Sequence, residues 1–463
     1  MQLRICIKRK NFAINSYYVL MAILLIAYYL IGINVPSIAF LMVAVIPAIF
    51  GTTSELLACV VSFIPISAAV QYKYALLISI VLMLVKNRWR VKSGGAFLLV
   101  LIMMVWELLH FACGYFSLVE YARDFAELLF MGALIMIDIS DLDHKMIIRS
   151  LSIVTVGVCI IMFIMQLQQY SFNILKVFAR SAADWRFGQG NMHSGRFALN
   201  FDANILGFIC NLSTCGLFLL GKKKEYEKID IVLTVASLFF AIITLSRAAI
   251  VCMLLIITLY VFAGENKGSK RIIGILSVFA VAAIVGVLVN KYLPAIFENL
   301  LERFRRKDIW NGRGNLFRKY MEFVFLSPAY LLFGIGMQGI VEKVSPIIWV
   351  DQVPHNGLQE ALVVWGIPGV IAVLMWVGMI VKLSKLYSGR KREFYQYVPL
   401  LLTLVFVMSV QLLTESRTLL ALSFSYICLC ISGNTNKQNE ENSEHVAKSV
   451  IDEFVSNVHR IAK

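Results

Sequence analysis

Charged side chains are scarce in this sequence. Only 15% of its 463 residues are Asp, Glu, Lys or Arg, whereas 59% are hydrophobic and the mean hydropathy is +0.78. A folded soluble chain cannot hide so much apolar surface, so this scarcity excludes a water-soluble globular protein. Apolar runs recur from Ser16 to Ile431, each close to the roughly 20 residues that cross the hydrocarbon of a bilayer.

Three other features are missing. The basic start MQLRICIKRKN precedes a run long enough to span, with no small-residue cleavage site after it, which argues against a cleavable signal peptide. The nine cysteines lie almost entirely in apolar runs, which excludes a disulfide or cysteine–metal framework. No internal repeat of the kind common in transporters is visible. What remains is an all-α, polytopic integral membrane protein.

Hydropathy predicts about 12–14 transmembrane helices. Basic clusters such as RICIKRK, GKKKEYEK and KLYSGRKR fall on one side of this layout, so both termini are expected in the cytoplasm. The candidate spans are 16–33, 36–50, 55–70, 72–86, 96–116, 118–137, 147–166, 197–220, 229–245, 248–263, 272–290, 357–381, 397–413 and 418–431.

The expected organisation is a transmembrane domain over residues 1–432 and a polar cytoplasmic tail over 433–463 that ends in a short amphipathic helix. A large extracytoplasmic loop covers about 290–355. Within it, residues 315–325 place apolar side chains at helical spacing, which predicts an amphipathic helix lying on the outer membrane surface. The net charge of +15 is spread over membrane loops, so it indicates lipid headgroups or an external anion rather than nucleic acid.

The stretch HNGLQEALVVWGIPG places His355 and Asn356 directly before an apolar helix. Imidazole is the side chain best suited to accept a proton near neutral pH. Asn356 could orient it or cap the helix, and Glu360 follows within about one turn. The alternative is an interfacial histidine with no role beyond capping.

Arginines gather at the same predicted face. Guanidinium groups bind phosphate oxygens with two parallel hydrogen bonds and stay charged when partly desolvated, which suits a lipid-linked phosphate or pyrophosphate. The alternative for each is simple contact with lipid headgroups. The candidate arginines are Arg196, Arg247, Arg303 and Arg313.

A competing signal is DISDLDHK, in which Asp141 and Asp143 form an Asp-x-Asp preceded by Asp138. Many sugar-nucleotide transferases hold a divalent metal with this motif. Here it falls in a short cytoplasmic turn without a nucleotide-binding domain, so we interpret it as helix capping and charge placement.

The motifs in order are GRFALNFDANILGF, TLSRAA, GRGNLFRKY, SPAYLLFGIGMQ and HNGLQEALVVWGIPG. Together they resemble the O-antigen polymerase and ligase family of bacterial envelope polysaccharide synthesis, which includes capsule and exopolysaccharide polymerases. The resemblance covers roughly residues 196–381. Two departures are Ala248, where Ser-Arg is usually followed by Gly, and Phe317 or Arg318, where a Trp often follows Gly-Arg.

The resemblance implies an inverting glycosyl transfer from an undecaprenyl-pyrophosphate-linked glycan at the outer face of the bacterial cytoplasmic membrane. His355 would be the base, and the arginines would replace a metal in stabilising the leaving pyrophosphate, so that no cofactor is expected. Further expected partners are the bilayer, a chain-length regulator and a flippase. Three functions remain open: a polymerase joining lipid-linked repeat units, a ligase moving a finished glycan to another acceptor, and a polysaccharide or lipid transporter without chemistry.

Overall fold

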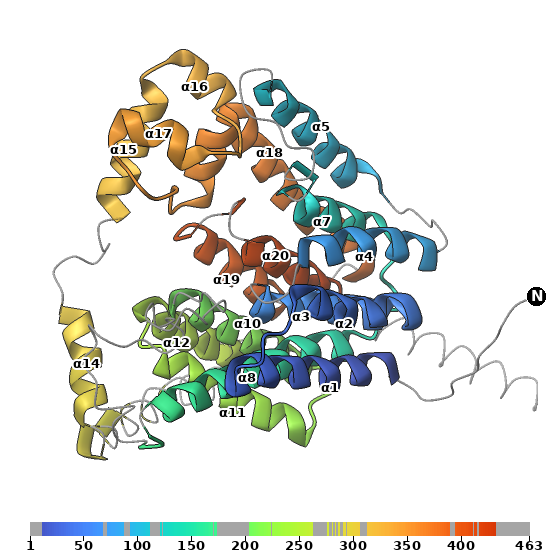
Figure 1. Cartoon of the computed structure of the whole chain (residues 1–463), viewed down its shortest axis with the longest axis vertical. Coiled ribbons are helices and arrows are strands. Elements are labelled where there is room, and N and C mark those ends of the chain that lie inside the picture. Colours follow the sequence, from blue (N-terminus) through green and yellow to red (C-terminus); the bar gives the residue numbers. More distant parts are fainter. Residues whose placement is uncertain are drawn as a thin grey trace, which may run out of the picture.

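The computed structural model describes residues 12–67, 72–87, 93–111, 121–169 except 123, 171–173, 203–262 except 224, parts of 276–305, 313–388, 394–410, 412–413 and 416–431. Within these ranges the chain forms helices joined by turns, with no β-strand (Figure 1). The helices of the first half are α1 (Phe12–Ile26), α2 (Ser37–Phe50), α3 (Thr53–Ile66), α4 (Tyr72–Lys86), α5 (Gly95–Phe111), α7 (Ala126–Met136), α8 (His144–Gln169) and α10 (Ala203–Lys222). Those of the second half are α11 (Lys228–Ile243), α12 (Arg247–Phe262), α14 (Pro294–Arg305), α15 (Arg313–Phe325), α16 (Pro328–Phe333), α17 (Ile340–Ile348), α18 (Gly357–Ser388), α19 (Val398–Val407) and α20 (Ser416–Cys430).

The length and composition of the helices confirm an all-α, polytopic membrane protein. Among the residues that the structure describes, four helical segments are long and apolar enough to cross a bilayer: Phe12–Ile31, His144–Gln168, Ala203–Lys222 and Gly357–Leu386. The same residues include seven further apolar helices of 10–17 residues. Large apolar side chains on the outside of the bundle, such as Val19 and Ile23 of α1, are more than half exposed, as expected where lipid is the solvent. The predicted count of 12–14 spans and the orientation of the termini stay predictions.

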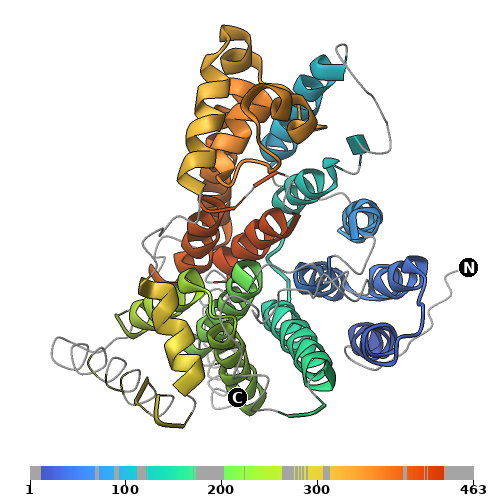
Figure 2. The same ribbon diagram turned by 60° about the vertical axis from the view of Figure 1, so that its left-hand side comes forward.

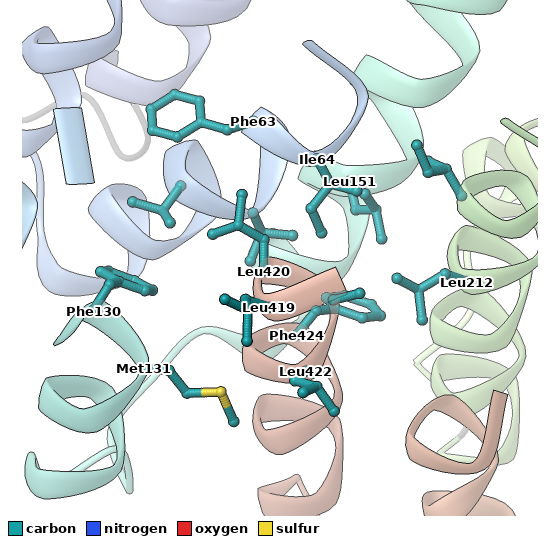
Figure 3. Close-up of a cluster of buried hydrophobic side chains, with 14 of the residues drawn as sticks. Phe63, Ile64, Phe130, Met131, Leu151, Leu212, Leu419, Leu420, Leu422 and Phe424 are labelled. Carbon is teal, nitrogen blue, oxygen red and sulfur yellow. The ribbon is translucent and has the colours of Figure 1, made fainter. Parts of the chain in front are cut away.

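The core lies where α3, α10 and α20 meet, because these helices are largely apolar and almost fully buried. Phe63 of α3, Leu212 of α10 and Phe424 of α20 belong to one cluster of buried hydrophobic side chains (Figure 3). At Gly216 of α10 an added methyl group would lie 2.8 Å from the Phe424 ring, so the two helices pack closely there. This rigid centre fixes where the ends of α20 lie.

The helices of the predicted outer loop gather at one end of the molecule. In both views α15, α16 and α17 lie together beside α5 and α18 (Figures 1 and 2). The helix expected at 315–325 is present as α15. Part of its apolar face is covered by protein, since Tyr320, Phe323 and Val324 are at most 1% exposed and α15 packs against α16, α17 and α18. Its placement on the membrane surface stays a prediction.

Helix α18 is broken near its first third. Gly366 has φ 68° and ψ −159°, a conformation that is essentially restricted to glycine, and Pro368 follows it. Gly334, in the segment after α16, has nearly the same backbone angles, with φ 75° and ψ −160°. An added Cβ on Gly334 would lie 2.3 Å from the carbonyl oxygen of Val364, so the two backbones touch where α18 is interrupted.

Candidate functional site

The start of α18 is capped by the asparagine of the His-Asn pair. The Oδ1 atom of Asn356 accepts the backbone N–H groups of Leu358 and Gln359, each at 3.1 Å. This is the usual N-cap arrangement, which satisfies donors that a helix leaves unpaired at its first turn. His355 lies half-buried immediately before this cap. An imidazole held at a helix N-terminus has the positive end of the helix dipole beside it, a favourable place for an anionic substrate.

Three predicted site residues reach the backbone of one turn. We call the described residues 408–410 and 412–413, between α19 and α20, the α19–α20 turn. Its Ser409 carbonyl accepts Arg313 Nη1 at 2.9 Å, and its Met408 carbonyl accepts Asn356 Nδ2 at 3.1 Å. The Oε2 atom of the fully buried Glu360 accepts hydrogen bonds from the N–H groups of Leu412 at 2.5 Å and Leu413 at 2.8 Å.

The N–H groups of Leu412 and Leu413 need this partner because both residues are buried, and an unpaired buried backbone donor is costly. A charge-assisted pair of N–H bonds to one carboxylate oxygen is also among the stronger hydrogen-bonding arrangements. Residues 313, 356 and 360 are therefore brought together on the α19–α20 turn, beside His355. Sequence spacing alone did not reveal this turn, since it lies more than 50 residues after α18 begins.

Two further bonds fasten α15 to the start of α18. Gln359 Nε2 donates to the carbonyl of Phe317 at 2.7 Å, and Tyr320 Oη donates to the carbonyl of Gln352 at 2.7 Å. Burial raises the pKa of Tyr320 to about 12, and the nearby charge of Glu360 adds to the effect. The phenol therefore remains a donor throughout the physiological range, and α15 holds Arg313 at a fixed distance from the α18 cap.

Arg247 opens α12 beside a small polar cluster. Ser246 Oγ accepts the N–H of Ala249 at 3.3 Å, capping the helix, and donates to Asn204 Oδ1 of α10 at 2.8 Å. Arg247 itself is half-buried. Both α10 and α12 pack against α19, the helix that leads into the α19–α20 turn.

The Ala248 departure from the family pattern does not disturb this backbone. Ala248 lies in the first turn of α12, where any residue is accepted, and the residue with positive φ is Leu245, at 50°. The conformational freedom expected of a glycine after Ser-Arg is thus not used at this position.

Two predicted arginines are not brought to the turn by the described structure. Arg196 lies outside the described residues. Arg303 lies in α14, of which only the backbone is described at this position, and α14 lies apart from α15–α17 in both views (Figures 1 and 2).

The Asp-x-Asp turn lies beside the first turn of α3, the N-terminal end of that helix. Asp143 Oδ1 accepts the N–H of Met146 at 3.0 Å, so it caps α8, while its own N–H donates to Ser54 Oγ at 2.9 Å. Asp138 and Asp141 line a cavity of about 310 Å³ together with Lys86. Over the part of the chain that the structure describes, no three His, Cys, Asp or Glu side chains converge as a metal site requires.

Glu107 and Arg417 are two of the buried charged residues that sequence reasoning did not single out. Glu107 of α5 is 2% exposed, and its two oxygens accept the N–H of Met337 and the Nε1–H of Trp365. Arg417, in the first turn of α20, is 6% exposed and donates Nε to Ser67 Oγ at 3.1 Å. Glu107 is the single charged residue of a long apolar run, and an isolated charge in a span is itself a signal of function.

The fold and the site together define a class of protein. It is an all-α membrane bundle in which an imidazole, a guanidinium and a buried carboxylate lie together where helices end. Residues 232–374 match the family model described as O-antigen ligase. This domain supports the O-antigen ligase and polymerase family for the chain, as the sequence motifs predict. The match includes Arg247, Arg303, Arg313, His355, Asn356 and Glu360. No curated protein matches the chain.

Proposed function

We propose that the protein is a polysaccharide polymerase. It transfers an undecaprenyl-pyrophosphate-linked glycan onto a lipid-linked repeat unit at the outer face of the cytoplasmic membrane, for O-antigen, capsule or exopolysaccharide synthesis. Its termini lie in the cytoplasm, and a chain-length regulator and a flippase are its further partners. The observation that carries the proposal is the convergence of Arg313, Asn356 and Glu360 on the α19–α20 turn, beside His355. All four of these residues lie inside the matched O-antigen ligase domain, residues 232–374.

In the proposed reaction the hydroxyl oxygen of the acceptor sugar attacks the anomeric carbon of the donor glycan. His355 takes the hydroxyl proton as the new C–O bond forms. The bond between the anomeric carbon and the pyrophosphate oxygen breaks, and its electron pair leaves with undecaprenyl pyrophosphate. Attack opposite the leaving group inverts the anomeric configuration.

The developing negative charge on the pyrophosphate is stabilised by arginines in place of a metal. Arg313 is held beside the α18 N-terminus, and Arg247 opens α12 near α19. Arg196 and Arg303 are proposed to join them when substrate is bound. A donor of this kind carries its own leaving group, so no nucleotide sugar and no divalent cation are required.

A ligase of the same family is the second candidate, since the O-antigen ligase domain supports both activities equally. The two differ in the acceptor, a lipid-linked repeat unit for a polymerase and a different envelope glycan for a ligase. A transporter without chemistry would leave both acceptors unmodified.

The test is the replacement His355→Ala in purified protein given lipid-linked repeat units, with products separated on a gel. Loss of a general base costs about 10²–10⁴-fold, so we expect single repeats where the unchanged protein gives a ladder. Asp351→Ala, an exposed position in the same segment, serves as the control and should leave the ladder unchanged. A normal ladder with His355→Ala removes the imidazole from catalysis, and transfer only to a foreign acceptor identifies the ligase.

A further inference from the structure

Glu107 joins three parts of the chain that are far apart in sequence. Its Oε1 accepts the N–H of Met337 at 2.8 Å, and its Oε2 accepts the indole Nε1–H of Trp365 at 2.6 Å. The partners lie 230 and 258 residues further along the chain. A buried carboxylate in an apolar helix is costly unless it is paired, and here each oxygen has one N–H donor.

Both partners belong to the place where α18 is broken. Trp365 is the last residue before Gly366, and Met337 ends the Gly334–Met337 segment that packs on the break. Ile335 N donates to the carbonyl of Val363 at 3.0 Å, and Gly336 N donates to that of Val364 at 2.8 Å. The Val364 carbonyl lacks its helical partner because residue 368 is proline, which has no N–H.

The break separates a short half-helix, Gly357–Trp365, from the remainder of α18. This half-helix carries the Asn356 cap at one end and Trp365 at the other, with His355 directly before the cap. Its direction is therefore set at one end by the α19–α20 turn and at the other by Glu107. An error of about 1 Å in the position of a catalytic group can lower a rate by roughly 100-fold.

We propose that Glu107 is a positioning residue for the transfer reaction: by binding Trp365 and Met337 together it fixes the half-helix Gly357–Trp365, and through it His355. This inference rests on the proposed function, and it assigns Glu107 no contact with substrate. The inference also explains the two glycines of the segment Gly334–Gly336, because the backbone there must pack closely against both α5 and the break in α18.

The chemistry of the two partners allows a sharp test. Both are donors, so only a carboxylate can accept from both. In Glu107→Gln the amide has the same shape, yet its NH2 group must face either the Met337 N–H or the Trp365 Nε1–H. Trp365→Phe removes one of these donors, so in the double variant the glutamine oxygen can bind Met337 while its NH2 group faces no competing donor.

The four proteins (unchanged, Glu107→Gln, Trp365→Phe and the double variant) are reconstituted in nanodiscs and assayed with lipid-linked repeat units. Glu107→Gln should lower kcat about 10- to 100-fold with KM changed less than about twofold. The double variant should be at least as active as Trp365→Phe alone, so that Glu107→Gln causes no further loss once the Trp365 donor is removed. Glu342→Gln, an exposed carboxylate on α17, is the control and should behave as the unchanged protein.

Hydrogen exchange measured by mass spectrometry provides a readout separate from activity. Glu107→Gln should speed exchange at residues 335–337 and 357–365, and the double variant should restore protection at 335–337. If the fold-loss of activity in the double variant equals the product of the losses in the two single variants, Glu107 and Trp365 act independently and the proposed coupling is overturned. Altered exchange with unchanged kcat would overturn the positioning role while leaving the proposed function intact. An unchanged protein that does not extend lipid-linked repeat units would refute the proposed function without altering the exchange result.

Discussion

At the scale of the residue, Arg313 acts through the shape of its guanidinium as well as its charge. One nitrogen, Nη1, donates to the Ser409 carbonyl, which orients the planar group at the α19–α20 turn. Lysine has a single ammonium that cannot hold this carbonyl and also present a fork to a pyrophosphate.

We therefore expect Arg313→Lys and Arg247→Lys each to lower the initial rate of chain extension about tenfold or more, measured with purified protein. Arg318→Lys is the matched control, since Arg318 lies on the same helix as Arg313, its side chain is 72% exposed, and it pairs at 3.5 Å with Glu322, whose side chain is 63% exposed. Near-normal rates with lysine at both 247 and 313 would show that these arginines only contact lipid headgroups and do not bind the pyrophosphate.

Tyr320 offers a prediction that depends on pH. In Tyr320→Phe the Gln352 carbonyl loses its donor, which costs about 1 kcal/mol of stability. Because the folded pKa of Tyr320 is raised to about 12, above the unfolded value near 10, its contribution is complete below about pH 10 and is lost as pH rises toward 12.

The stability difference between the unchanged protein and Tyr320→Phe should accordingly be constant from pH 7 to 9 and shrink above about pH 10, as followed by denaturant unfolding in detergent. Tyr292→Phe, at a tyrosine that is 66% exposed, is the control and should show no such difference at any pH. A difference that grows with alkalinity would contradict the assigned donor.

At the scale of the element, the break in α18 depends on glycine at position 366, so one added methyl group should disturb it. Gly366→Ala places a Cβ 2.5 Å from the backbone of Leu332 and holds alanine at φ 68°, which costs at least about 1–3 kcal/mol. We expect a lower Tm in detergent and weakened chain extension.

Gly378→Ala is the control for this change because it lies in the same helix with no atom within 4 Å of the added Cβ. Alanine there should leave Tm unchanged or raise it slightly, since glycine is a poor helix former by about 0.5–1 kcal/mol. Equal Tm values for both variants would show that the break tolerates an ordinary backbone conformation.

The same element shows how far sequence reasoning reaches. Hydropathy placed a helix at 357–381, and α18 runs over Gly357–Ser388; the span expected at 147–166 is α8, His144–Gln169. These succeed because apolar runs and helix starts are local properties of the chain. The break at Gly366 was not foreseen, because it depends on a segment 30 residues away whose backbone replaces the missing helical bonds.

The site was predicted in its residue types more than in its arrangement. The His-Asn pair and Arg313 stand out from sequence, since polar groups beside apolar runs are rare. That Arg313, Asn356 and Glu360 share the α19–α20 turn, and that Glu107 holds Trp365, follows only from packing between distant helices. The predicted cytoplasmic helix in the tail lies outside the described residues.

At the scale of the whole molecule, α3 separates two polar regions. In its first turn, Ser54 Oγ accepts a hydrogen bond from the N–H of Asp143. Directly after its last turn, Ser67 Oγ accepts one from Nε of Arg417 in α20. At 1.5 Å per residue these two ends are about 20 Å apart. The aspartate turn and the α19–α20 turn therefore lie at opposite ends of the bundle, which makes the two candidate reaction sites experimentally separable.

If arginines stabilise the leaving pyrophosphate, the chemical step proceeds without divalent cations. Purified protein given lipid-linked repeat units should extend them in excess EDTA and without nucleotide sugar, and Asp141→Ala should retain the activity. Asp143→Ala should lose about 1 kcal/mol of stability, because Asp143 caps α8, yet keep its rate at temperatures where it stays folded. Activity that dies with chelator and with Asp141→Ala would move the reaction to the aspartate end of α3, and the polymerase proposal would fail, since its substrate is taken to react at the opposite face.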